Sequence, residues 1–161
     1  MIAINETSKE VFFHIGLTLF AAQSFEESLS GMLTGIYVTE NASNWRENYL
    51  NEIQSLDKLP LGKLLIKARK AVSFDHEVDE ILQRALDQRN RFIHRYYRDS
   101  FALLVDPLRH RQLVSELTAL QHLFRTADDL IEPLSYKLML KAGMTDQQIS
   151  EFAHRSVSSQ L

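Results

Sequence analysis

Apolar residues recur every three or four positions along most of the chain, which is the spacing of one face of an α-helix. A first segment from Thr7 or Ser8 to about Tyr37 keeps this spacing at eight positions: Phe12, Ile15, Leu19, Ala22, Phe25, Leu29, Met32 and Ile36. The hydroxyl of Thr7 or Ser8 can cap this helix by accepting a hydrogen bond from its first turn. The pattern predicts a long first helix that mostly faces a core.

Two shorter segments and a third helix are predicted next. The polar stretch 38–58 keeps helical spacing at four positions, which favours a short connecting helix: Trp45, Tyr49, Ile53 and Leu56. Pro60 suits the first turn of a second helix, because the missing N–H of proline is unpaired there in any case. That helix carries apolar residues at Leu61, Leu64, Leu65 and Ala68. The run SFDHEVDE supplies capping residues for a third helix from about Glu77 to Tyr97.

The last long helix has the seam of a helical bundle. From Leu113 its apolar residues alternate at spacings of four and three, at positions 113, 117, 120, 124, 127, 131, 134 and 138. Pro133 lies inside this pattern and removes a backbone donor, so a kink or a break one turn earlier is expected. After Gly143, Thr145 and Gln148 resemble a capping box that opens a short C-terminal helix at about residues 145–155.

Together these elements predict an all-α protein. The architecture is an up-and-down bundle of four principal helices, with short connecting and C-terminal helices. A chain of 161 residues that is 45% hydrophobic has enough material for one compact domain over residues 1–161. No alternating strand pattern and no internal repeat is visible in the sequence.

Composition excludes several kinds of site. The chain has no cysteine, so it has neither disulfides nor a thiolate ligand nor a thiol nucleophile. A di-iron bundle needs paired Glu-x-x-His motifs, and only Glu151 with His154 has that spacing. The histidines at 14, 76, 110 and 122 lack ligand spacing and are expected to be surface or capping residues. We therefore predict no metal and no cofactor.

Two features that the sequence lacks give an expectation for the cellular location of the protein. The N-terminus has no positive region followed by an apolar run, and no stretch reaches 18 uncharged apolar residues. We expect a cytoplasmic protein that neither spans nor binds a membrane.

Charge is unevenly distributed along the chain. The net charge is −3, but the segment from Lys58 to Arg98 holds ten Lys and Arg against five Asp and Glu, and is therefore +5. Its last ten residues, RNRFIHRYYR from Arg89 to Arg98, contain four arginines, a histidine and two tyrosines. A basic face on an acidic protein is compatible with a polyanionic substrate, although arginines on solvated helix surfaces give the same composition.

The positions of these residues on the third helix restrict what they can do together. An apolar stripe of Val78, Leu82, Ala85, Leu86, Ile93 and Tyr96 is interrupted at Arg89 and Asn90. A buried arginine must extend its head to water, pair with a carboxylate or line a cleft. Asn90 and His94 share a face, whereas Arg89 and His94 diverge by about 140°. They meet only if Arg89 wraps around, if the helix ends near His94, or if two copies of the motif face each other in a symmetric dimer.

The motif resembles a known superfamily. Arg89 and Asn90, followed after three residues by His94 and then by Tyr96, look like the signature of the HEPN superfamily, and more narrowly that of HepT-type toxins. The helix order, including a second helix that opens with LGKLL, is similar over a core of about residues 10–137. Active members are metal-independent endoribonucleases that work as homodimers. HepT-type toxins are paired with nucleotidyltransferase antitoxins, which modify the tyrosine of the motif with AMP.

The resemblance implies a role for each residue of the motif. The 2′-hydroxyl of RNA can attack the adjacent phosphodiester if a base, an acid and cations are in place, leaving a 2′,3′-cyclic phosphate. His94 suits the acid or base, Arg89 the phosphate oxygens, and Asn90 the orientation of either group. Tyr96 is a candidate for modification by AMP. The residues expected to bind the RNA backbone and bases are Arg91, Arg95, Arg98 and Tyr97, although either tyrosine can instead pack within the bundle.

One alternative is a protein that has the same fold but no ribonuclease activity. A HEPN-like dimer that no longer cleaves RNA would serve as an interaction or ligand-binding module. His94 would then be a hydrogen-bonded core histidine, and Arg89 a buried partner of Asp87 or Glu26.

Overall fold

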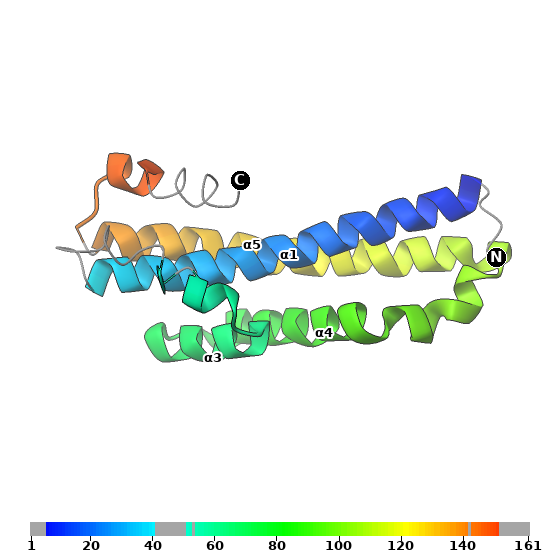
Figure 1. Ribbon diagram of the computed structural model, residues 1–161, viewed down its shortest axis with the longest axis horizontal. Helices are drawn as coiled ribbons and strands as arrows, with labels where there is room; N and C mark the ends of the chain where they lie inside the picture. The colour runs from blue at the N-terminus through cyan, green and yellow to red at the C-terminus, as the bar shows by residue number, and fades with distance from the viewer. Residues whose placement is uncertain (1–5, 41–50, 53, 142, 152–161) are drawn as a thin grey trace. The chain divides into compact units, whose positions relative to one another are not determined.

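A computed structural model of the chain describes residues 6–40, 51–52, 54–141 and 143–151. Its long helices are α1 (Glu6–Glu40), α4 (His76–Leu104) and α5 (His110–Lys141), with the shorter α3 (Leu61–Ala71) and a 3₁₀ turn η1 (Pro107–Arg109) between them (Figure 1). No strand occurs in these ranges, so the prediction of an all-α helical bundle is confirmed. None of the described helices is both long enough and apolar enough to pass through a lipid bilayer.

The third predicted helix is longer than expected. Asp75 caps α4 by accepting a hydrogen bond from the backbone N–H of Val78 at 2.9 Å, as the SFDHEVDE run predicted. The expected end near Tyr97 is wrong, because the buried stripe continues through Ser100 and Leu104. The Arg89–Arg98 motif therefore lies inside the helix rather than at its C-terminal end.

Two other predicted features concern α5 and the C-terminal helix. α5 runs through Pro133 without a break, so a break at that point is excluded. The capping box is confirmed: Thr145 N–H donates to Gln148 Oε1 at 2.9 Å, and Gln148 N–H donates to Thr145 Oγ1 at 3.3 Å. Residues 146–151 are helical, and the remainder of that predicted helix lies outside the described residues.

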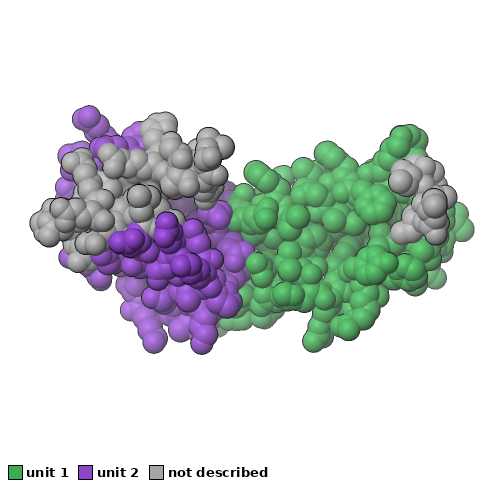
Figure 2. Space-filling view, viewed as in Figure 1, with its two compact units in different colours: residues 1–25, 75–127 green, residues 26–74, 128–161 purple. Residues whose placement is uncertain are grey.

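The chain forms two compact units, each built from separate stretches of sequence. The first unit is residues 1–25 with 75–127, and the second is residues 26–74 with 128–161 (Figure 2). α4 belongs wholly to the first unit and α3 to the second, while α1 and α5 contribute residues to both. The motif and everything that packs around it below belong to the first unit.

The core of the first unit joins three helices. Val11 from α1, Phe92, Tyr96 and Leu104 from α4, and Leu113 and Leu117 from α5 form one buried cluster. The rings of Phe92 and Tyr96 lie 5.2 Å apart between centroids. Burying each such side chain contributes about 1.5–3 kcal/mol, so this cluster holds α4 against its two neighbours.

Buried polar groups of the first unit also join its helices. Gln121 Nε2 donates to Thr18 Oγ1 at 3.1 Å and to the carbonyl oxygen of His14 at 3.2 Å. His110 is only 3% exposed, and its Nε2 lies 3.0 Å from the carbonyl oxygen of Leu104 in the last turn of α4. Of the two roles predicted for this histidine, a surface position is therefore wrong and a helix-capping position is correct.

The second unit has a separate core. Its fully buried side chains come from α1, α3, α5 and the segment before α3: Leu29, Met32, Leu56, Leu61, Leu64, Leu65 and Ile131. The Tyr136 hydroxyl donates to Asp146 Oδ1 at 2.6 Å, which ties the C-terminal helix to α5. Residues 51–52 and 54–57 of the predicted connecting segment are helical and Lys58 forms a turn, whereas Trp45, Tyr49 and Ile53 lie outside the described residues.

Two glycines of α1 allow a test of helix stability. A Cβ at Gly16 meets no atom within 4 Å, whereas a Cβ at Gly35 comes within 2.5 Å of Met139 Cε. We expect Gly16→Ala to raise the free energy of unfolding by about 0.5–1 kcal/mol, because alanine restricts the unfolded chain and favours the helix. Gly35→Ala should raise the free energy of unfolding by less, because the Met139 side chain must move to make room for the added methyl group. Urea titration with an unchanged m-value measures both, and an equal gain at the two sites would contradict the packing described here.

Candidate functional site

Helical periodicity turns the motif residues toward different surroundings. Phe92 and Tyr96 are buried, Arg89 is half-buried, and seven motif residues are exposed: Asn90, Arg91, Ile93, His94, Arg95, Tyr97 and Arg98. The apolar spacing predicted Ile93 and not Phe92 in the buried stripe, and this is wrong: Phe92 is buried and Ile93 is 41% exposed. Asn90 consequently does not interrupt the buried face, although Arg89 does.

Arg89 occupies the edge of the apolar stripe. Its Nε atom is buried, and its Nη1 lies 3.4 Å from Asn90 Oδ1 as a long hydrogen bond. The methylene groups thus lie along apolar surface while part of the guanidinium reaches the polar side of α4.

Asn90 and His94 line a shallow groove of about 440 Å³ on the exposed side of α4, with Asp87, Arg91, Arg95 and Asp99. Arg91 Nε lies 3.5 Å from Asp99 Oδ2, which is a weak and solvent-exposed ion pair. Arg89 does not line this groove, in agreement with its five-residue separation from His94. Since α4 continues to Leu104, the helix does not end near His94 and cannot bring the two side chains together in that way.

An apolar groove borders the motif on the side of α1. It encloses about 350 Å³ and is lined by Phe12, Ile15, Leu19, Phe92, Ile93, Tyr96, Tyr97 and Leu104. Tyr97 is 67% exposed and its ring lies 5.6 Å from that of Phe101, so Tyr97 does not pack into the core. An exposed apolar surface of this kind marks an interaction site more often than a solvated one.

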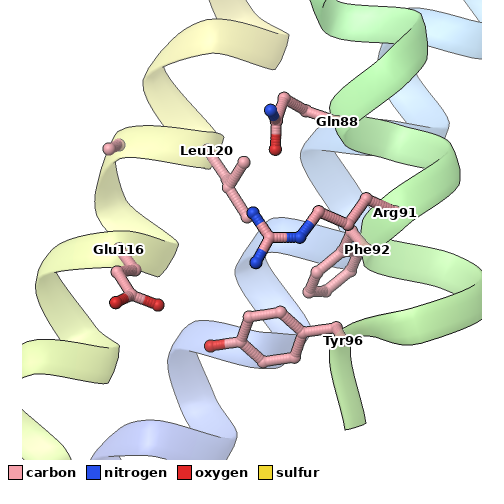
Figure 3. A pocket seen from close by; sticks show the side chains of 7 residues that line it. Gln88, Arg91, Phe92, Tyr96, Glu116 and Leu120 are labelled. Atoms are coloured by element: carbon pink, nitrogen blue, oxygen red, sulfur yellow. The ribbon is translucent and has the colours of Figure 1, made fainter. Parts of the chain in front are cut away.

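A third hollow lies between α4 and α5 (Figure 3). It has a volume of about 270 Å³ and is lined by Gln88, Arg91, Phe92, Tyr96, Glu116, Ala119 and Leu120. Arg91 reaches into it from α4, and Glu116 lies opposite on α5 (Figure 3). Glu116 also accepts a hydrogen bond from Gln112 at 3.0 Å. Sequence reasoning missed Glu116, because it lies more than twenty residues from the motif and has no distinctive spacing.

Tyr96 lies at the base of this hollow with its hydroxyl buried. Among the described residues, the hydroxyl oxygen has no hydrogen-bond partner of ordinary geometry. Burial is the largest cause that raises the pKa of Tyr96 above 10.0, and the nearby Ser100 hydroxyl partly opposes it. Glu116 raises this pKa further, whereas Arg91 lowers it. Modification of Tyr96 by AMP remains a prediction, and it requires a movement that exposes the hydroxyl.

No group of three or more potential metal ligands gathers within residues 6–40, 51–52, 54–141 and 143–151. No protein-family model, curated protein or solved structure matches the chain. The resemblance to the HEPN superfamily therefore depends on the motif and the order of the helices alone.

The buried hydroxyl of Tyr96 gives a prediction for stability. We expect Tyr96→Phe to raise the free energy of unfolding by about 1 kcal/mol at neutral pH, because it removes a buried polar group that lacks a partner. The raised pKa adds a pH dependence. Above pH 10 the unfolded tyrosine ionises before the folded one, so the wild-type protein loses stability as pH rises and the variant loses less.

Denaturant titrations between pH 7 and pH 11 measure both effects. Tyr97→Phe is the matched control, because its hydroxyl belongs to an exposed side chain and its removal should change stability by less than about 0.5 kcal/mol. A loss of stability in Tyr96→Phe would show that the hydroxyl has a partner in the folded protein.

Proposed function

We propose that this chain is one subunit of a dimeric, metal-independent endoribonuclease of HEPN type, which cleaves RNA through attack of the 2′-hydroxyl. The observation that supports this best is the groove on α4, where Asn90 and His94 lie beside two arginines on a solvent-exposed surface. A solvent-exposed imidazole next to an amide and guanidinium groups suits general acid–base chemistry on a phosphodiester. A core histidine, as the inactive alternative required, would be buried.

In this proposal each motif residue has a separate role in the reaction. His94 takes or gives the proton, and Asn90 orients it or a phosphate oxygen. The exposed guanidinium groups of Arg95 and Arg98 hold the RNA backbone, and Arg91 binds the RNA where the groove adjoins the hollow between α4 and α5. The exposed ring of Tyr97 stacks on an unpaired base. Arg89 stabilises the phosphate in the transition state, for which a second subunit is required.

Homodimerisation accounts for two features at once. Arg89 does not line the groove of His94 within one chain, so a neighbouring subunit must present its motif for the two groups to share a phosphate. The apolar groove of Phe12, Leu19, Ile93 and Tyr97 lies beside the motif and gives a second copy apolar surface to bury. A two-fold axis beside α4 would place both motifs in one cleft.

The wider biological setting follows from the resemblance. We propose a cytoplasmic toxin or defence effector that is held in check by a nucleotidyltransferase-type antitoxin, with Tyr96 as the modified residue. The carboxylates of Asp87 and Asp99 favour the inactive alternative, since they offset the two arginines of the groove and weaken its attraction for phosphate.

Substitution of His94 distinguishes these functions. We expect the purified protein to cleave single-stranded RNA in EDTA, with products that end in 2′,3′-cyclic phosphate. His94→Ala should lower the rate by about 10²–10⁴-fold, which is the usual contribution of a general acid or base. His122→Ala is the matched control, because His122 is an exposed histidine of the same unit outside the groove. Equal cleavage by both variants would exclude His94 from the reaction.

A charge placed in the apolar groove tests the dimer. Ile93→Asp puts a carboxylate on surface that the second copy would bury, so we expect a monomer in analytical ultracentrifugation and at least a tenfold loss of cleavage. Leu108→Asp is the control, since Leu108 is 92% exposed in η1 and does not line that groove. A monomeric wild-type protein that still cleaves RNA would contradict the shared active site.

A further inference from the structure

The hollow between α4 and α5 is separate from the groove that holds His94, but the two share one wall. Arg91 lines both of them, whereas Asn90 and His94 line only the groove and Glu116 only the hollow. A polymer whose backbone lies along the groove could therefore place one side group past Arg91 into the hollow. RNA has such a side group in each base, which is attached to the backbone at every nucleotide.

The size and lining of the hollow suit a single ring system. Its volume of about 270 Å³ is just below the range of pockets that hold drug-sized ligands. Phe92, Tyr96 and Leu120 give it apolar walls, and Gln88, Arg91 and Glu116 give it polar ones (Figure 3). This mixture is what a planar heterocycle requires, because its faces are apolar and its edge carries hydrogen-bonding groups.

The hydrogen bonding of two polar side chains in the wall of the hollow supports the presence of a ligand. The Tyr96 side chain is 9% exposed, and its hydroxyl, at the base of the hollow, has no hydrogen-bond partner among the described residues. Within residues 6–40, 51–52, 54–141 and 143–151, the exposed guanidinium of Arg91 makes a long ion pair of 3.5 Å with Asp99 on the groove side, which leaves donors for a ligand. A buried polar group with incomplete hydrogen bonding, such as the Tyr96 hydroxyl, is common where a ligand completes the bonding.

The arrangement of donors and acceptors favours guanine over the other bases. A carboxylate such as that of Glu116 accepts two parallel hydrogen bonds, and guanine alone among the four bases has two adjacent donors, N1–H and the 2-amino group. A guanidinium such as that of Arg91 donates to O6 and N7 of guanine, which are both acceptors. Adenine offers a donor where guanine has O6, and cytosine and uracil each lack the adjacent pair of donors.

We infer that the hollow between α4 and α5 is a guanine-binding pocket, in which Glu116 accepts from N1–H and the 2-amino group and Arg91 donates to O6 and N7. A movement of the Tyr96 side chain that exposes its hydroxyl lets this group donate to O6 as well. As a base-specificity pocket it depends on the proposed ribonuclease function and defines its substrate as RNA with a guanine next to the cleaved phosphodiester. The same chemistry would hold a free guanine nucleotide, in which case the pocket is regulatory.

Binding to the full-length His94→Ala variant tests the pocket without cleavage. The probes are fluorescent oligouridines in which one central residue is guanine, inosine, adenine or cytosine, and the measurement is fluorescence anisotropy. We expect guanine to bind at least tenfold more tightly than adenine or cytosine, with inosine in between because it lacks the 2-amino group.

Substitution of the pocket residues completes the experiment. Adding Glu116→Gln should lower the affinity for the guanine probe to that of the adenine probe, because the amide replaces one acceptor by a donor. Glu10→Gln, which removes an exposed carboxylate of α1 with the same change of charge, should leave the preference unchanged. Tyr96→Phe should weaken guanine binding more than adenine binding.

Each result supports or overturns the pocket. Displacement of the guanine probe by GMP but not AMP, at similar concentrations, indicates a free nucleotide as the natural ligand, whereas guanine preference without displacement indicates the RNA base. Equal affinity for all four probes, or a preference that survives Glu116→Gln, overturns the assignment. If the wild-type protein does not cleave RNA, the proposed ribonuclease function is wrong. The guanine pocket is still tested in that case, because binding is measured without cleavage.

Discussion

The packing of Phe92 and Tyr96 against α1 and α5 is the constraint on which the site depends. These two side chains lie four residues apart on α4 and belong to the buried cluster with Val11, Leu113 and Leu117. Because an α-helix is rigid about its axis, burying one face fixes the direction of every other residue on it. The exposure of His94 and the half-burial of Arg89 therefore follow from how the core is packed and not from any contact between the two.

The same rotation separates the motif residues within one chain. His94 and Asn90 lie on the exposed side, Arg89 on the edge of the buried stripe, and Arg91 between the groove and the hollow. In the proposed reaction, Arg89 and His94 act on one phosphate only if they come from two copies of α4, because Arg89 does not line the groove of His94. In a bundle with the motif on one helix, a second copy of the chain is the simplest source, and the apolar groove beside the motif provides the surface for it.

Much of the fold could be predicted from the sequence, but the site only in part. Long apolar periodicity and capping residues such as Asp75 and Thr145 are local signals, and they gave the order of the helices and two caps correctly. The assignment of Ile93 rather than Phe92 to the core failed because adjacent apolar residues both fit a helical stripe, and only the contacts with α1 and α5 decide between them. Glu116 could not be found, since its relation to Arg91 is created by tertiary packing.

The two sides of the first unit's core differ in how their buried side-chain polar groups are bonded. On the α1 side of the core, Gln121, Thr18 and the backbone of His14 satisfy one another, although all three are buried or partly buried. On the α5 side, the Tyr96 hydroxyl lies buried beside Glu116 and Arg91 without such a network. A phenylalanine at position 96 would fill the same core without that cost. A ligand that bonds to the Tyr96 hydroxyl would offset this cost, which would account for a tyrosine in the wall of a polar hollow.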